Sequence, residues 1–152
     1  MIRPMRPGDL AGVKAVIDSV GLFPSEMMDD MVADHFAGRA PDQVWAVVDG
    51  GSARAVLCAE PERMTAGTFN CLLLAVHEDL RRQGWGGRLM TWLEGDLAAR
   101  GAHLLLVETS DLPEFEGTRR FYRKQGYEEE ARIRDFYRPG EDKVVFRKTL
   151  GR

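Results

Sequence analysis

Residues 71–109 read CLLLAVHEDLRRQGWGGRLMTWLEGDLAARGAHLLLVET, and the order of apolar and polar residues in this stretch decides the fold. It opens and closes with apolar runs of strand length, Cys71 to Val76 and Leu104 to Val107, and the first run indicates a strand covered on both faces. Between them, a helix that ends at Gly101 is predicted by apolar residues at helical spacing, Leu89, Trp92, Leu93 and Leu97. A strand, a helix and a second strand make a βαβ unit, so the two strands should be parallel.

The part of the chain before this unit predicts two helices and further strands. Asp9 is expected to cap a helix that ends at Gly21, and a second helix begins after Ser25 and ends at Gly38. The apolar stripe of the second helix is Met28, Met31, Val32, His35 and Phe36. Strands are predicted over 1–6, 44–48, 53–59 and 68–76, with a hairpin turn at 49–51.

The remaining chain adds one helix and two strands. A helix that carries Phe121 and Tyr122 stops at Gly126, and strands follow near 127–138 and 143–150, joined by the turn 139–142. With the βαβ unit, these elements predict a single domain over 1–152 of the α/β (α+β) class. Its sheet should be mixed, mostly antiparallel, of about seven strands, with helices on both faces.

Composition and charge fit a folded domain of ordinary size. The chain has 152 residues, 44% of them apolar, so it can bury a core without disulfides or metals, and we expect no metal. Its formal charge of −3 argues against a nucleic-acid partner. It has no apolar run of membrane-spanning length and no signal core, so we expect a cytoplasmic protein that binds no membrane. Cys58 and Cys71 are expected to be buried thiols.

A basic, glycine-rich turn, Arg81-Arg82-Gln83-Gly84-Trp85-Gly86-Gly87, stands between the first strand of the βαβ unit and its helix. The first amide groups of a helix lack internal partners, and the helix dipole adds partial positive charge there. Glycines allow a ligand to approach the backbone closely, and the arginines, with Arg88, add full charges. The turn therefore predicts a site for a pyrophosphate group.

Other interpretations of this turn fit its residues less well. A Walker loop needs Gly-Lys-Ser/Thr after its glycines, and this chain lacks that sequence. A dinucleotide fingerprint needs a glycine where Leu89 stands, and its first glycine should directly follow the strand. Glu108, 22 residues beyond Gly86, does stand where a ribose-binding acid could. A tight turn without a ligand is the remaining alternative.

The same residues resemble the signatures of the GNAT acetyltransferase superfamily. Leu74-Ala75-Val76-His77 followed by Arg81-Arg82-Gln83-Gly84-Trp85-Gly86 matches its Arg/Gln-x-x-Gly-x-Gly/Ala signature. Phe121-Tyr122-Arg123-Lys124-Gln125-Gly126-Tyr127 is similar to its Phe-Tyr-x-Lys-x-Gly-Phe/Tyr helix end. The order of the predicted elements is also that of the family, so the resemblance spans essentially the whole chain. It implies an acyltransferase that uses acetyl-CoA.

The resemblance implies a role for each matching position. The backbone of Leu74, Ala75 and Val76 should pair with the pantetheine arm, and Tyr122 should protonate the departing thiolate. Glu108 matches a position where some members place a general base; a substrate ligand and a structural carboxylate are its other interpretations. Phe115 departs from the family, which often has a cofactor-contacting asparagine there. The pyrophosphate should be bound by Arg81, Arg82, Gln83, Gly84, Trp85, Gly86 and Gly87.

The resemblance implies an amine as acceptor and leaves its kind open. Acidic residues near the expected acceptor pocket favour a small cationic amine; they are Glu26, Asp29, Asp30, Glu108, Asp111, Glu114 and Glu116. A protein or peptide N-terminus is a second kind of acceptor. A sensor module that binds coenzyme A without turnover is a different function, which the presence of Tyr122 disfavours. A homodimer is compatible with the sequence.

Overall fold

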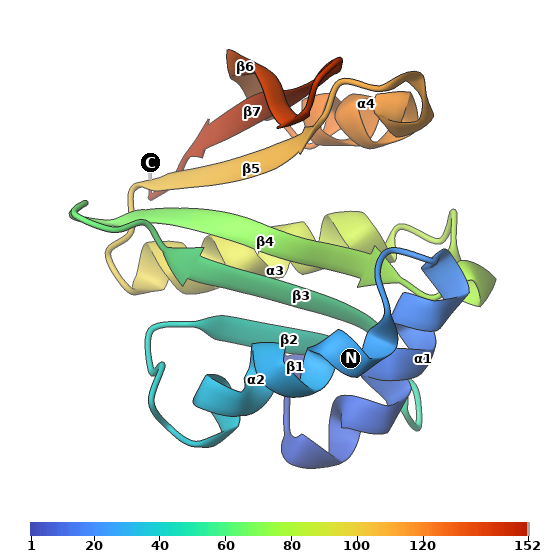
Figure 1. Ribbon diagram of the computed structural model, residues 1–152. Coiled ribbons are helices and arrows are strands. Elements are labelled where there is room, and N and C mark those ends of the chain that lie inside the picture. The colour runs from blue at the N-terminus through green and yellow to red at the C-terminus, as the bar shows by residue number, and fades with distance from the viewer. Residues whose placement is uncertain (152) are drawn as a thin grey trace. The chain divides into compact units, whose positions relative to one another are not determined.

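The structure is a computed structural model that describes residues 1–151. Its seven strands are hydrogen-bonded in the order β1-β2-β3-β4-β5-β7-β6, with four α-helices between them (Figure 1). The predicted α/β class with a mixed sheet is confirmed. The chain divides into two compact units: the first is Met1–Glu60 with Leu72–Leu93, and the second is Pro61–Cys71 with Glu94–Arg152. A single domain over 1–152 stays a prediction.

The elements agree closely with the predicted ones. The first unit contains β1 (Ile2–Pro4), α1 (Leu10–Val20), α2 (Met28–Phe36), β2 (Val44–Asp49), most of β3 (Ala53–Pro61), the end of β4 (Thr68–Val76) and the start of α3 (Trp85–Ala99). The second unit contains the rest of β4 and α3, then β5 (Leu104–Ser110), α4 (Glu116–Lys124), β6 (Glu128–Arg138) and β7 (Glu141–Thr149). The last turn is shorter than expected, because Glu141 and Asp142 already belong to β7.

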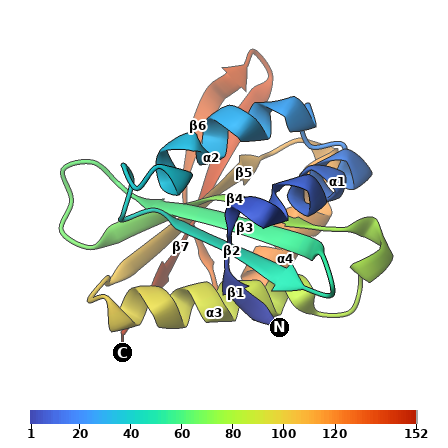
Figure 2. The same cartoon turned by 90° about the horizontal axis from the view of Figure 1, so that it is seen from below.

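The core of the first unit lies between its strands and the helices α1 and α2. Met28 and Val32 of the predicted stripe are fully buried there, and Met31 and Phe36 pack against the same core. Figure 2 shows α1 and α2 on one side of β2 and β3, with α3 on the other, so helices cover both faces as predicted. The main core side chains from the helices and strands are Val13, Val16, Ile17, Trp45, Val47, Val56, Leu73 and Ala75.

Asp9 does not cap α1 with its side chain, contrary to the prediction. A short 3₁₀ helix over Pro7–Asp9 precedes α1, and the Asp9 carboxylate turns back across it to accept the Arg6 amide at 2.8 Å. The same carboxylate accepts two hydrogen bonds of 2.8 Å from the Arg3 guanidinium. Asp9 therefore ties the first strand to the start of the first helix.

We expect Asp9→Asn to lower stability at neutral pH and to weaken the pH dependence of unfolding in acid. The pKa of the Asp9 carboxyl is held below its usual range, chiefly by the hydrogen bonds from Arg3. A group with a lowered folded pKa stabilises the fold above its unfolded pKa of about 3.9, and this stabilisation is lost as the pH falls through the folded value. Urea unfolding between about pH 2 and 7 measures it, and identical pH profiles for the two proteins would contradict the assignment.

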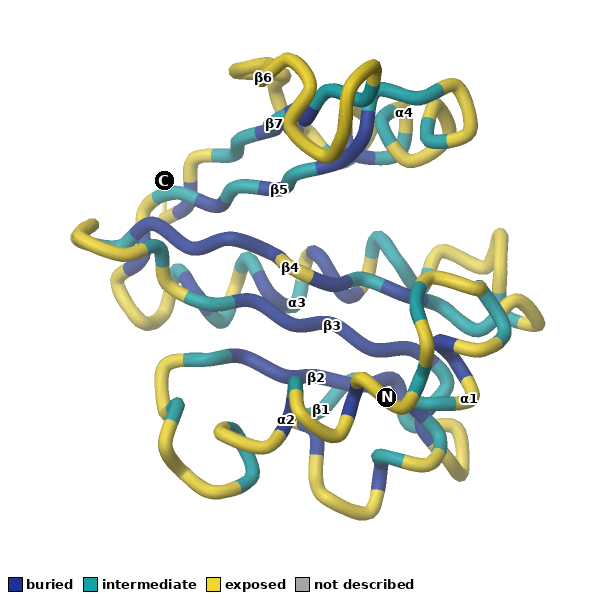
Figure 3. Tube along the Cα trace, in the orientation of Figure 1, coloured by how far each residue is buried: buried dark blue, intermediate teal, exposed yellow. Residues whose placement is uncertain are grey.

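The burial of side chains in strand β4 changes halfway along the strand. Residues 68–71 are all buried, whereas coverage on both faces was predicted for the run Cys71 to Val76. From Leu72 onward only alternate residues are buried: Leu73 and Ala75 lie in the core of the first unit, whereas Leu72 is 51% exposed (Figure 3). Leu74 and Val76 are half-buried. The prediction of coverage on both faces is therefore wrong for the end of β4, because the side chains there alternate between a core face and an open face.

The second unit is a sheet with α4 packed on one face. Residues 68–71 of β4 pair with 104–107 of β5 in parallel, as predicted for the βαβ unit. Strand β7 pairs antiparallel with both β5 and β6. Tyr122 of α4 is buried beside Phe146 of β7, with ring centroids 6.1 Å apart. Strand β6 is the last strand in the order, and every one of its residues is exposed (Figure 3).

Candidate active site

The glycine-rich segment of the first unit is a bend that runs directly into a helix. A short 3₁₀ helix, Glu78–Leu80, follows β4, and α3 begins at Trp85. Gly86 and Gly87 therefore belong to the first turn of α3. The sequence analysis had placed them in the glycine-rich segment before the helix. The bend itself has two residues with positive φ, Arg82 at 65° and Gly84 at 81°.

This bend leads into the N-terminal amides of α3, where an anion can be bound. The first helical hydrogen bond after Gly84 runs from the Arg88 amide to the Gly84 carbonyl oxygen, at 3.1 Å. The preceding amide groups stand at the positive end of the helix dipole. A Cβ atom added at Gly84 would meet no atom within 4 Å, so open space lies beside the backbone here. These features fit a bound pyrophosphate group.

Most side chains of the bend are exposed to solvent. Arg81, Arg82 and Gln83 are exposed, and Trp85 is half-buried. The Arg88 guanidinium lies 4.6 Å from the centroid of the Trp85 ring, so a cation–π contact holds this arginine. Arg81, Arg82 and Arg88 are all exposed, so three basic side chains add positive charge at the bend.

The segment before the bend is anchored to the first unit. The His77 amide donates to the Arg54 carbonyl oxygen at 2.9 Å, and the Asp79 amide donates to the His77 ring at 3.2 Å. The Arg54 guanidinium lies 3.6 Å from the Asp79 carboxylate. These contacts fix the path of the chain from Val76, the last residue of β4, to the start of the bend.

In the second unit, Tyr122 is surrounded by aromatic rings. It is 5% exposed, and its ring centroid lies 5.0 Å from that of Phe121, 5.7 Å from Tyr127 and 6.1 Å from Phe146. The pKa of the Tyr122 phenol is raised above its ordinary value, chiefly by burial and further by the nearby Cys71. The Tyr122 hydroxyl therefore stays protonated at neutral pH and can donate a hydrogen bond. Its orientation is fixed by packing before any ligand arrives.

Glu108 has a partner that the sequence analysis missed. Its carboxylate lies 3.1 Å from the Lys143 ammonium, and the Lys143 residue is only 8% exposed. The Glu108 side chain retains 29% exposure, so it is still accessible. Lys143 follows the last turn, 35 residues away, and the contact depends on the pairing of β5 with β7. Only the correct strand register could have revealed this contact from the sequence.

Tyr122 and Glu108 lie on opposite faces of the β5–β7 pair. Val107 is registered with Phe146, on the face that α4 covers, and Glu108 is the next residue along β5. Because successive side chains of a strand point to opposite faces, Glu108 points away from α4. All the predicted cofactor-binding residues are in the first unit, whereas this pair is in the second.

Most of the acids expected near an acceptor already have basic partners. Besides Glu108, Asp111 lies 3.6 Å from Arg132, and Asp29 lies 2.7 Å from Lys14. Glu116 pairs with Arg120 at 3.4 Å. The charge available to attract a cationic acceptor is thus smaller than the count of acids suggests. Phe115, half-buried before the start of α4, offers no polar side-chain atom for the contact that the family asparagine makes.

Two kinds of feature are absent from the described part of the chain. Residues 1–151 contain no group of three or more His, Cys, Asp or Glu side chains that could hold a metal ion. None of the helices described is long and apolar enough to cross a membrane.

Comparison with protein-family models identifies one family. Residues 40–129 match the acetyltransferase (GNAT) domain. A solved GNAT-family acetyltransferase from Desulfovibrio desulfuricans is similar, with 29% identity, coverage of 98% of each chain and a TM-score of 0.88. An aminoglycoside 6'-N-acetyltransferase complexed with coenzyme A has the same fold, with 20% identity over 98% of this chain and 96% of that chain, at a TM-score of 0.77. The ribosomal-protein-S18-alanine N-acetyltransferase from Escherichia coli also has this fold. Its identity is 18% over 100% of this chain and 94% of that chain, at a TM-score of 0.79. No curated protein matches this chain significantly.

Proposed function

Because this chain belongs to the GNAT acetyltransferase family, we propose that it transfers the acetyl group of acetyl-CoA to the primary amine of a small molecule. Acetyl-CoA-dependent acyl transfer follows from the family, whereas the acceptor and the site residues are the proposed part. The observation that supports the site most directly is the bend at Arg82 and Gly84, which leads into the N-terminus of α3. Two similar structures are an aminoglycoside 6'-N-acetyltransferase and a ribosomal-protein-alanine N-acetyltransferase, and both act on amine acceptors.

The first unit supplies the groups that would hold the cosubstrate. The amides of residues 82–87 would bind its pyrophosphate, and the exposed Arg81 and Arg82 would add charge. The backbone of residues 74–76, which lie beyond the part of β4 registered with β5, would pair with the pantetheine arm. When bound, acetyl-CoA supplies the thioester carbonyl that the amine attacks. The enzyme needs no nucleophile of its own, because holding both reactants in place is sufficient for direct transfer.

The second unit supplies the groups for proton transfer. Tyr122, whose phenol is protonated at neutral pH, would donate its hydroxyl proton toward the thiolate that leaves. Glu108, on the other face of the sheet, would bind the acceptor ammonium or accept its proton. One acts on the leaving group and the other on the attacking amine.

The experiment that tests this function is a screen of primary amines with acetyl-CoA, in which thiol release and acetylated product are both measured. Turnover with small amines supports the proposal. Acetylation of peptide N-termini alone would indicate the protein-directed activity instead. Tight binding of acetyl-CoA with no turnover on any amine or peptide would indicate a sensor module and reject the proposal.

We expect Glu108→Gln to lower kcat/KM for the best amine by about ten- to a hundredfold, while acetyl-CoA affinity stays near wild type. The amide keeps the shape of the side chain but can neither accept the amine proton nor attract an ammonium group with a full charge. Steady-state kinetics in both substrates and calorimetric titration with acetyl-CoA provide the measurement.

A matched control is Glu129→Gln on β6, which removes an exposed ion pair with Arg123 on the face of the sheet opposite to Glu108. This variant should retain wild-type kinetics, since exposed pairs contribute little to stability. If Glu108→Gln also retains wild-type kinetics, Glu108 is a structural carboxylate that only pairs with Lys143.

A further inference from the structure

Arg54, at the start of β3, reaches the segment before the glycine-rich bend and keeps one hydrogen-bond donor without a partner. Its Nη2 atom lies 3.6 Å from the Asp79 carboxylate. Its Nε atom is buried and has no hydrogen-bond partner within residues 1–151. A buried donor without a partner lowers stability. A side chain that keeps such a donor is more typical of a functional position than of one that only stabilises the fold.

The Arg54 residue is itself held firmly by the first unit. Its stem passes the turn between β2 and β3, where a Cβ atom added at Gly50 would come within 3.3 Å of the Arg54 Cγ atom. Its backbone carbonyl oxygen accepts the amide of His77, the residue directly after β4, at 2.9 Å. Arg54 is therefore anchored to two neighbouring parts of the sheet before its guanidinium reaches Asp79.

Asp79 connects this anchored side chain to the bend through its carboxylate, amide and carbonyl groups. The carboxylate faces the Arg54 guanidinium and also lies 3.6 Å from the His77 ring. The amide donates to the Nδ1 atom of the same ring at 3.2 Å. The carbonyl oxygen accepts the side-chain amide of Gln83 at 3.4 Å. Asp79 thus links Arg54 and His77 with Gln83, which belongs to the bend.

The bond from Gln83 closes the chain around Arg82. Residues 79–83 form a short loop that this bond closes, and Arg82 lies inside it with a φ of 65°. A residue other than glycine keeps a left-handed conformation only where surrounding contacts hold it. Such a conformation within a turn directs successive amide groups to one side, which forms a concavity that binds anions. The contacts of Asp79 therefore hold the conformation that an anion would need.

Stabilisation of the fold does not explain this arrangement well. The Asp79 side chain is 70% exposed, and exposed ion pairs contribute little to stability. Preorganisation of the bend explains it better, because a site that already has its bound conformation loses no binding free energy to ordering. The affinity of a site falls in proportion to the population of its competent conformation.

We propose that Arg54 is a positioning residue for cosubstrate binding, which acts through Asp79 to hold the bend in the conformation that binds a pyrophosphate group. Arg54 does not contact the cosubstrate: its effect passes to Asp79, and the bond from Gln83 carries it to Arg82. This proposal rests on the proposed function, because it assumes that the bend binds the pyrophosphate of acetyl-CoA.

The test measures the binding of coenzyme A to the full-length protein by calorimetric titration. Arg54→Met keeps the stem of the side chain and removes the guanidinium, and it should weaken this binding by about three- to tenfold. Asp79→Ala should weaken it by a similar factor. Because both residues act in one series of contacts, the double variant should bind no more weakly than the weaker single variant. Arg54→Lys, which keeps the charge, should recover part of the affinity.

Three further measurements separate positioning from a structural role. Arg54→Met also removes a buried donor without a partner, so its melting temperature should not fall below that of the wild type. Hydrogen exchange of residues 79–88 in the ligand-free variant should become faster, since the bend is held less firmly. The KM for acetyl-CoA should rise by the same factor as the Kd for coenzyme A, whereas the KM for the amine and kcat at saturating acetyl-CoA stay at wild-type values.

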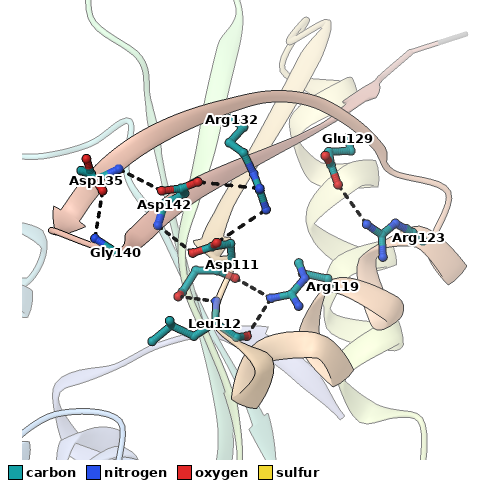
Figure 4. A network of polar contacts seen from close by, with 10 residues as sticks. Asp111, Leu112, Arg119, Arg123, Glu129, Arg132, Asp135, Gly140 and Asp142 are labelled. Atoms are coloured by element: carbon teal, nitrogen blue, oxygen red, sulfur yellow. Dashed lines mark hydrogen bonds and ion pairs between the residues drawn. The ribbon is translucent and has the colours of Figure 1, made fainter.

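The matched control is Arg132→Met, the same substitution in an ion-pair network of the second unit. The Arg132 guanidinium lies 3.6 Å from the Asp111 carboxylate and 3.7 Å from that of Asp142 (Figure 4). None of the residues proposed to hold the pyrophosphate belongs to that unit. Arg132→Met should therefore keep wild-type affinity for coenzyme A and wild-type hydrogen exchange over residues 79–88.

Two results would overturn the inference alone. One is wild-type affinity for coenzyme A in both Arg54→Met and Asp79→Ala. The other is a double variant whose loss of affinity equals the product of the two single losses, because independent effects would indicate that Arg54 contacts the ligand directly. Wild-type affinity in a folded Gly84→Val variant would instead overturn the proposed binding site, and the inference with it.

Discussion

We expect Tyr122→Phe to lower kcat by about 10²- to 10⁴-fold, the range typical of a lost general acid. The substitution removes the hydroxyl and keeps the ring, so the contacts with Phe121, Tyr127 and Phe146 remain. Acetyl-CoA affinity and thermal stability should therefore stay near wild type. Without a proton donor, the thiolate must leave as an anion in a largely buried setting, which is costly. Single-turnover kinetics at saturating amine measure this effect where chemistry limits the rate.

A matched control is Tyr127→Phe, which removes the neighbouring buried phenol. The Tyr127 hydroxyl donates to the Glu94 carboxylate at 2.6 Å, so its loss should cost stability of about 1–3 kcal/mol and leave kcat nearly unchanged. If Tyr122→Phe and Tyr127→Phe have the same modest effect on kcat, Tyr122 is a packing residue and another group or a water molecule protonates the thiolate.

The second large effect is expected at the bend of the first unit, where Gly84→Val should weaken acetyl-CoA binding by at least about tenfold, or 1.4 kcal/mol. A side chain at this position would extend into open space, since no protein atom lies within 4 Å of an added Cβ. It would therefore fill the space that the pyrophosphate is expected to occupy. Calorimetry or equilibrium dialysis with coenzyme A provides the measurement.

The control for Gly84→Val is Gly51→Val in the turn between β2 and β3. Gly51 also has a positive φ, 97°, with no atom within 4 Å of an added Cβ. Both variants impose a similar backbone strain of about 1–2 kcal/mol, so their melting temperatures should fall alike. Only Gly84→Val should lose affinity. Equal affinities for the two folded variants would show that the bend does not bind the cosubstrate.

The fold could be predicted from local patterns, because apolar periodicity and glycines indicate where the helices and strands begin and end. The predicted bounds of β4 are those of the structure. Three helices are followed by a glycine with positive φ, as predicted: Gly21, Gly38 and Gly126. Periodicity and glycine stops are properties of neighbouring residues, so they can be recognised in a single sequence. The glycine-rich bend was recognisable for the same reason, since all its parts lie within seven residues.

The parts of the site that could not be predicted depend on pairing across the sheet. Glu108 and Lys143 meet only because β5 pairs with β7 in one register. Asp9 was assigned to the wrong partner because the preceding 3₁₀ helix turned its carboxylate toward Arg3.

If Arg82 binds the cosubstrate as proposed, its left-handed conformation marks a position where stability is exchanged for binding. A side chain at positive φ costs about 1–2 kcal/mol relative to the ordinary helical region, and glycine would avoid this cost. Glycine would also remove the guanidinium beside the predicted pyrophosphate. A selection for heat resistance alone would then favour glycine at position 82, whereas a selection for growth that requires acetyl transfer would keep arginine. Thermostabilised variants with glycine here should be checked for cosubstrate affinity before they are used.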